Sequence, residues 1–162
     1  MNKKINYFNN EKICSFAFNL TSKFEENFIE KYLKNNFLKF LRMYDDTAGK
    51  VLENGWHTKI SNLNRDTYVQ WVYSGATIFK TSIIRNYRFY DLNKGFNYLE
   101  DLHFSFNLTK KNFQHIVIAQ AKVGNPNFVR RTDYLFGNIE VQNRYKIVCL
   151  FNLNKKLFFI TI

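Results

Sequence analysis

Residues 96–106 of the chain read Phe-Asn-Tyr-Leu-Glu-Asp-Leu-His-Phe-Ser-Phe. Two adjacent acids, Glu100 and Asp101, stand where a run of apolar residues at helical spacing begins. Acids in the first turn complement the positive end of the helix dipole. The stretch therefore predicts a helix over residues 100–111, with Asn112 as the left-handed residue that ends it.

Working outward from this helix, the chain alternates between helical and strand-like patterns. The chain is long enough for one domain. The alternation therefore predicts an α/β fold that forms one half of a layered sandwich. The expected elements are a helical stripe over 24–44, a turn over 45–49, an ambiguous stretch over 50–60, a strand over 68–79 interrupted at 74–75, a short helix over 81–84, a loop over 86–98, a buried strand over 113–121, a helix over 134–151, and an apolar stretch over 155–162 that is either a strand or a surface tail.

The composition is that of one folded domain. The chain has 162 residues, of which 46% are hydrophobic and 19% aromatic, so it can bury a core and is not expected to be disordered. Proline occurs once, at Pro126, and glycine is sparse, which argues against a scaffold built mainly from loops.

The chain is strongly basic, with a formal net charge of +11. Such a charge favours polyanionic partners, namely phosphates, nucleic acid or an anionic membrane surface. The basic residues are spread along the chain, so a solvated basic surface explains them equally well. Because no basic stripe and no RNA-binding motif accompany the aromatic residues, nucleic acid is the less favoured partner.

Cysteine usage and the N-terminus bear on the compartment. Cys14 and Cys149 have no metal-binding spacing and stand in apolar contexts, which predicts two buried, reduced thiols. Residues 1–7 are not followed by the apolar region of a signal peptide, and no apolar run is long enough for a transmembrane helix. We therefore expect a cytoplasmic protein, either free or peripheral at the inner membrane face.

A second motif precedes the acidic pair: residues 71–79 read Trp-Val-Tyr-Ser-Gly-Ala-Thr-Ile-Phe. Small residues at a strand end let a ligand approach the backbone, and Gly75 permits an unusual dihedral angle there. A β-bulge or tight packing explains the same residues without a ligand. Trp71 is equally suited to stacking on a sugar or to filling the core.

In this order and spacing, the two motifs resemble the acceptor-side half of family-2 glycosyltransferases, which are inverting enzymes with a GT-A fold. The resemblance covers about residues 40–150. It implies a single-domain, partial GT-A fold, which is an α/β/α sandwich of the nucleotide-diphospho-sugar transferase type. The implied organisation is a helical segment of undecided assignment over 1–40, the acceptor-side half over 41–153, and an apolar tail over 154–162.

The resemblance also implies roles for individual residues. Each has an ordinary structural alternative: first-turn acids commonly complement the helix dipole, and a helical arginine is commonly exposed. The implied roles are Asp101 as the catalytic base that deprotonates the acceptor hydroxyl, Glu100 as the residue that orients it or touches the acceptor, Ser74, Gly75 and Ala76 under the sugar, Lys80 as the basic residue that follows them, Trp71 as a stacking platform, and Arg144 as a contact to a donor phosphate.

The donor side of such an enzyme is not visible in the sequence. The family carries an Asp-x-Asp motif that holds Mg²⁺ or Mn²⁺ on the diphosphate, and Asp45-Asp46 lacks the intervening residue and follows a helix. The histidine that many relatives place near the position of Gly124 is missing. The three histidines match no zinc spacing, so no metal ligand is predicted; they are His57, His103 and His115.

The sequence thus favours a glycosyltransferase of polysaccharide biosynthesis, in truncated or split form. It would move a sugar from a nucleotide-diphosphate donor to a glycan or a lipid-linked acceptor, with a partner chain or a missing segment supplying the donor half. The alternatives are a non-catalytic module that keeps the acceptor surface and, less favoured, a basic-aromatic nucleic-acid-binding domain. The sequence names neither donor, acceptor nor linkage.

Overall fold

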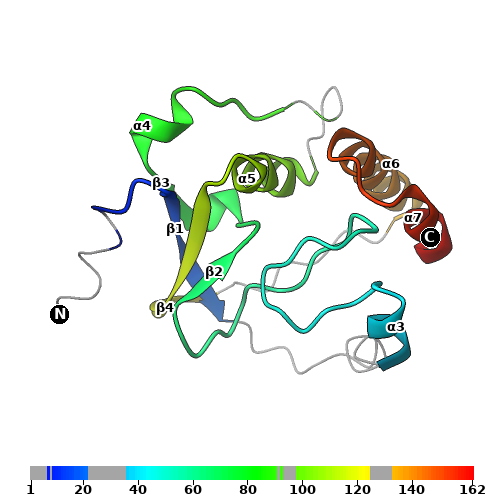
Figure 1. Ribbon diagram of the computed structural model, residues 1–162, viewed down its shortest axis with the longest axis horizontal. Coiled ribbons are helices and arrows are strands. Elements are labelled where there is room, and N and C mark those ends of the chain that lie inside the picture. Colours follow the sequence, from blue (N-terminus) through cyan, green and yellow to red (C-terminus); the bar gives the residue numbers. More distant parts are fainter. Residues whose placement is uncertain (1–6, 8, 22–35, 91, 93–97, 125–132) are drawn as a thin grey trace.

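The computed structural model describes residues 7, 9–21, 36–90, 92, 98–124 and 133–162 (Figure 1). Within them the chain is a mixed α/β domain with one four-stranded sheet and five α-helices. The elements are β1 (Ile13–Thr21), α3 (Asn36–Phe40), β2 (Thr67–Val69), the 3₁₀ helix η1 (Ser74–Ala76), β3 (Thr77–Phe79), α4 (Thr81–Ile84), α5 (Glu100–Lys110), β4 (Gln114–Gly124), α6 (Tyr134–Leu150) and α7 (Lys155–Thr161).

The sheet has the strand order β2-β4-β1-β3. The two long central strands, β1 and β4, run parallel, with Phe16 opposite Ile116, and the short strands at the edges are antiparallel to their neighbours. The sequence predicted a helical segment over residues 1–40, and this is wrong over residues 13–21, which form the strand β1. Residues 13–17 are all buried, and such a continuous apolar run has no strand alternation to reveal it.

Helix α5 packs against the sheet and forms the centre of the main core (Figure 1). Its buried Leu102 and Phe106 join Ala17 of β1 and Val117 of β4 in one apolar cluster. The helix predicted over 100–111 is confirmed, and Asn112 ends it in the left-handed conformation, with φ 66°.

Several other sequence predictions are confirmed by the structure. The strand over 113–121 is β4, the helix over 134–151 is α6, and the short helix over 81–84 is α4. The strand over 68–79 is split into β2 and β3, and the interruption falls at η1, where the sequence placed it. Most of the predicted stripe over 24–44 lies outside the described residues, and its end forms α3.

Near the C-terminal end, the strand considered for residues 155–162 and the predicted burial of Cys149 are wrong. The stretch over 155–162 is the helix α7, because the Asn154 side chain accepts a hydrogen bond from the Leu157 N–H and so caps its start. Cys149 is exposed, since it lies on the outward face of α6, whereas Cys14 is buried as expected. Among the described helices, none is long and apolar enough to cross a membrane.

Candidate functional site

The two sequence motifs meet at one open cavity of about 580 Å³. Ser74 and Gly75 from η1 form one part of its wall, and Glu100 at the start of α5 forms another. Two aromatic residues complete the wall, Phe79 from β3 and Phe89 from the following loop. The fold therefore brings together three of the site residues that the sequence predicted.

The acidic pair follows a strained backbone position. Leu99, immediately before α5, has φ 71° and ψ 15°, a left-handed conformation that costs a non-glycine residue about 1–2 kcal/mol. Its side chain is 5% exposed and packs in the main core, which holds the residue in place. Strain of this kind, held by surrounding packing, directs the chain into α5 so that Glu100 reaches the cavity wall.

Asp101 sits behind Glu100, beside Ser74 of η1, and unlike Glu100 it is not among the residues that line the cavity. Burial raises the pKa of its carboxyl group, the N–H groups of Leu102 and Ser74 donate hydrogen bonds that oppose the rise, and the neighbouring Glu100 charge adds to it. The Leu102 N–H lies 2.8 Å from Asp101 Oδ1. A carboxylate with a raised pKa is a stronger general base than an ordinary aspartate.

A buried hydrogen-bond network fixes the start of α5 relative to the irregular segment 70–73, which leads from β2 into η1. Ser105 Oγ donates to the Asp101 carbonyl oxygen at 2.6 Å and accepts from the Val72 N–H at 3.2 Å. The Ser105 carbonyl oxygen lies 2.8 Å from His115 Nε2, and His115 Nδ1 lies 2.6 Å from Ser15 Oγ. The hydrogen bonds thereby connect the central strands β1 and β4, the helix α5 and the segment that precedes η1.

The network determines the proton positions on His115. A carbonyl oxygen only accepts, so Nε2 carries the proton toward Ser105, and Nδ1 accepts from the Ser15 hydroxyl. Burial lowers the pKa of His115 to about 4, which keeps the ring neutral. Burial also raises the pKa of the adjacent Cys14 thiol to about 12, so this thiol is not a nucleophile.

Phe89 gives the cavity an aromatic face; the resemblance implies that its loop, 86–98, faces the acceptor, but it gives Phe89 no role of its own. Its ring stacks on Phe104 of α5, with centroids 4.0 Å apart and planes 16° apart, and the residue is 46% exposed. One face of the ring is therefore fixed and part of the side chain stays open. The feature of the sequence that pointed to Phe89 was its position in the loop between the two motifs. Phe96, in the same loop, lies outside the described residues.

Gly75 contributes open space rather than an unusual backbone angle. Its φ is not positive, and a Cβ built on it would meet no atom within 4 Å. The expectation of an unusual dihedral angle is wrong, but the expectation of room beside the backbone is confirmed.

Two predicted site residues lie elsewhere, inside the fold. Trp71 is 1% exposed and donates from Nε1 to the Thr58 carbonyl oxygen at 3.0 Å. Arg144 is 2% exposed, pairs with Glu140 at 2.7 Å and donates to the Gly55 carbonyl oxygen at 3.1 Å. Neither side chain lines the cavity, and both are engaged in structural contacts.

The remaining two predicted residues are close in sequence to the site but do not line the cavity. Ala76 closes η1, with its N–H donating to the Tyr73 carbonyl oxygen at 3.0 Å. The Lys80 ammonium donates to the Asn10 carbonyl oxygen at 2.7 Å and lies 6.0 Å from the centroid of the Phe16 ring.

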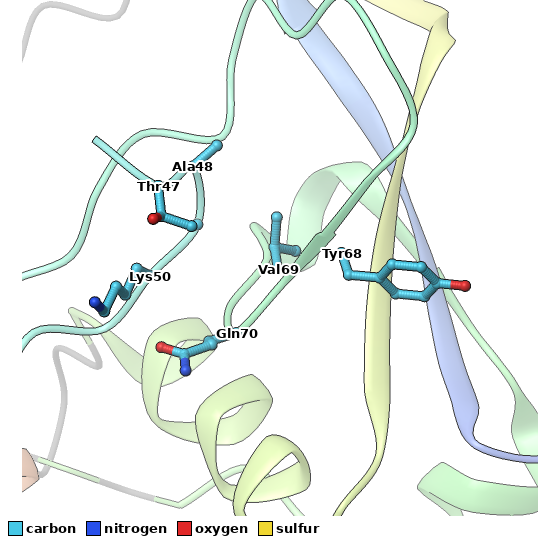
Figure 2. Close-up of a pocket in the computed structure, with 7 residues that line it drawn as sticks. Thr47, Ala48, Lys50, Tyr68, Val69 and Gln70 are labelled. Atoms are coloured by element: carbon cyan, nitrogen blue, oxygen red, sulfur yellow. The ribbon is translucent and has the colours of Figure 1, made fainter. Parts of the chain in front are cut away.

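A second, smaller cavity of about 240 Å³ lies between the 47–50 turn and β2 (Figure 2). Figure 2 shows the Tyr68 side chain pointing away from Lys50 and Gln70. The Lys50 ammonium binds the Asp45 carboxylate, and Gln70 Oε1 accepts from the Val51 N–H at 2.7 Å. These polar groups are therefore committed to holding the turn, and no predicted site residue lines this cavity.

Acidic, histidine and cysteine side chains do not cluster in the part of the chain that the structure describes. No group of three or more His, Cys, Asp or Glu side chains in this part of the chain converges on a point where an ion could sit. Asp45 and Asp46 belong to a turn, as predicted, and they pair with Lys50 and Lys39 respectively.

No family model, curated protein or solved structure matches the chain. The cavity and its lining residues are therefore the basis of the functional proposal.

Proposed function

We propose that this chain is the acceptor-side half of an inverting glycosyltransferase similar to family 2, with a partial GT-A fold. The supporting observation is the cavity at which Ser74 and Gly75 of one motif meet Glu100 of the other. In this family the same two motifs surround the acceptor sugar.

The reaction requires one proton transfer and one exchange of bonds at carbon. Asp101 takes the proton from an acceptor hydroxyl while that oxygen forms a bond to the anomeric carbon of a nucleoside-diphosphate sugar. The bond from that carbon to the diphosphate oxygen breaks, and its electron pair leaves with the diphosphate. Glu100, at the cavity wall, contacts the acceptor. The raised pKa of Asp101 suits it to the role of base.

The acceptor in this proposal is a sugar, free in a glycan or linked to a lipid. The open space beside Gly75 lets a sugar ring approach the backbone of η1. The partly exposed Phe89 ring, held flat against Phe104, offers a rigid surface for the apolar face of that sugar.

The donor and its cation belong to another part of the proposed enzyme. In this proposal, Mg²⁺ or Mn²⁺ and the nucleotide would be bound by a donor half in a further segment or a partner chain.

Saturation-transfer NMR with methyl β-glycosides of glucose, galactose and N-acetylglucosamine tests the acceptor site. We expect saturation transfer to at least one glycoside, and at least a roughly fivefold weaker affinity for Phe89→Ala, because an aromatic contact is worth ~1 kcal/mol or more. Tyr68→Ala, which removes an exposed ring that does not line the cavity at Ser74, Gly75 and Glu100, is the matched control and should bind like the parent chain. If saturation is transferred to none of the three glycosides, the proposal is contradicted.

The alternative is a module that binds the acceptor without transferring sugar, and it is favoured by the position of Asp101, which is not among the residues that line the cavity. Incubating the chain with radiolabelled UDP-sugars, Mn²⁺ and the glycoside that binds separates the two. Label transfer that Asp101→Asn abolishes, with glycoside binding retained, supports the enzyme. Because the proposed enzyme takes its donor half from a further segment or a partner chain, binding without transfer supports the module only when that donor half is present in the assay.

A further inference from the structure

The outward side of α7 carries a surface that the fold leaves uncovered. Phe159 is 60% exposed, Ile160 is 67% exposed and Ile162 is 58% exposed. The opposite side of the helix is buried through Phe158, which is 1% exposed and packs on Tyr145 of α6 with ring centroids 5.4 Å apart. The exposure is therefore a property of a docked helix and not of a loose end.

Figure 1 shows α7 lying against α6 on the side away from the sheet. Tyr145, 37% exposed, extends the apolar surface onto α6, since its ring also contacts Phe159 with centroids 5.6 Å apart. Contiguous exposed apolar side chains of this size mark an interaction surface.

Positive charge borders the apolar residues. Lys155 and Lys156 are exposed, and each stands one helical turn before an exposed apolar residue, Phe159 and Ile160 respectively. Helix α7 contains no acidic residue, and the whole chain carries a formal net charge of +11. Lysine stems can lie along an apolar boundary while their ammonium groups reach phosphates above it.

We propose that this face, made of Lys155, Lys156, Phe159, Ile160 and Ile162 with Tyr145, docks the protein on the surface of an anionic lipid membrane. The phenyl ring and isoleucine side chains enter the boundary of the acyl chains, and the two ammonium groups pair with lipid phosphates. This inference concerns where the molecule sits and does not depend on the proposed sugar chemistry.

A second copy of the chain suits the face less well. In a two-fold interface the same patch meets itself, so the partner would bring the same lysines and no acidic side chain from its own α7. An anionic lipid surface complements both the apolar side chains and the lysines.

Co-sedimentation with vesicles measures the proposed docking. One set of vesicles contains phosphatidylglycerol and phosphatidylcholine in a ratio of one to three, and the other contains phosphatidylcholine alone. We expect binding to the anionic vesicles that is weaker in 1 M salt, where the Debye length falls to about 3 Å. The affinity of the Phe159→Ser/Ile160→Ser variant for anionic vesicles should be at least tenfold weaker than that of the parent chain. The affinity of Lys155→Gln/Lys156→Gln should fall roughly fivefold for each lysine replaced.

The control variant is Ile78→Ser/Val123→Ser, which removes two exposed apolar side chains from the sheet edge and strand end and should bind like the parent chain. All variants should keep the parent melting temperature, because exposed side chains contribute little to stability. Binding to neither vesicle overturns the proposal, as does equal loss in the control. Sedimentation velocity showing a dimer that the Phe159→Ser/Ile160→Ser variant abolishes, without vesicle binding, assigns the face to a second copy instead.

Discussion

At the scale of single residues, Asp101 is where the stability of the fold and the proposed chemistry make opposite demands. Burial raises its pKa in the folded chain, so the folded state holds this proton more tightly than the unfolded state. The group therefore stabilises the fold below its unfolded pKa, and that contribution is lost as pH rises through the folded pKa. Asp101→Asn should raise the melting temperature at pH 7 by roughly 2–4 °C, and by less at pH 4.

Differential scanning calorimetry at the two pH values measures this effect. The asparagine keeps an oxygen that accepts from the Leu102 N–H, so the hydrogen bond is preserved. Asp133→Asn is the matched control, because this exposed carboxylate caps α6 and its replacement should shift the melting temperature little at either pH. A lower melting temperature for Asp101→Asn at pH 7 would mean that the ionised carboxylate stabilises the fold.

A second residue-scale prediction compares two glycines. Gly49 has φ +66°, and a Cβ built on it would lie 2.4 Å from Val69 Cβ and 2.8 Å from Ile60 Cγ2. Gly49→Ala should therefore destabilise the chain by about 2–4 kcal/mol in urea unfolding, through backbone strain and overpacking. Gly75→Ala should cost less than about 0.5 kcal/mol, because its Cβ meets nothing.

The same pair of variants tests the site. If a sugar approaches the backbone at Gly75, the added methyl group of Gly75→Ala should weaken glycoside binding without affecting stability. Equal glycoside affinity in Gly75→Ala and the parent chain would show that the sugar does not reach η1.

At the scale of elements, local signals in the sequence explain what could be predicted. The start of α5 and its end at Asn112 depend on dipole and backbone preferences that act within a few residues, and both are confirmed. The strand β1 was missed because its burial comes from strands distant in sequence. The helix α7 was missed because it is very short and depends on one capping residue and one buried phenylalanine.

The candidate site divides in the same way. Ser74, Gly75 and Glu100 were found because small residues and paired acids form recognisable motifs, and they line the cavity. Trp71 and Arg144 were assigned from the resemblance, and a motif in the sequence does not distinguish a binding aromatic or cation from a buried one. Their partners come from remote loops that the sequence does not place.

One element-scale contact governs how α5 meets η1. Ser105→Ala removes the hydroxyl that accepts from the buried Val72 N–H, and should cost about 1–3 kcal/mol of unfolding free energy. Hydrogen exchange at the Val72 amide should accelerate. Thr109→Ala is the matched control on the same helix, because Thr109 Oγ1 donates to the Gln70 carbonyl oxygen at 2.9 Å, away from η1.

The two variants should also differ in function. Glycoside binding should weaken in Ser105→Ala and persist in Thr109→Ala, because only the first loosens the start of α5 against η1. Loss of binding in both would show that general destabilisation, rather than the position of α5, controls the cavity.

At the scale of the whole molecule, stability in acid depends on His115, which joins β1, β4 and α5. Its pKa is lowered to about 4 from the model-peptide value of 6.5, so the unfolded chain binds this proton more readily. The contribution of neutral His115 is therefore complete above pH 6.5 and is lost as pH falls toward about 4. The shift corresponds to a loss on the order of 3 kcal/mol.

Urea unfolding at several values between pH 7 and pH 4 should show this loss, partly offset by the opposite contribution of Asp101. His115→Gln lowers stability at pH 7 but should flatten the dependence on pH, because glutamine does not titrate. The histidine that bears the acid sensitivity also holds Ser105, and Ser105 holds the start of α5 against η1. Glycoside binding should therefore weaken over the same pH range, before the chain unfolds globally. Binding that stays constant until global unfolding would separate the network from the cavity.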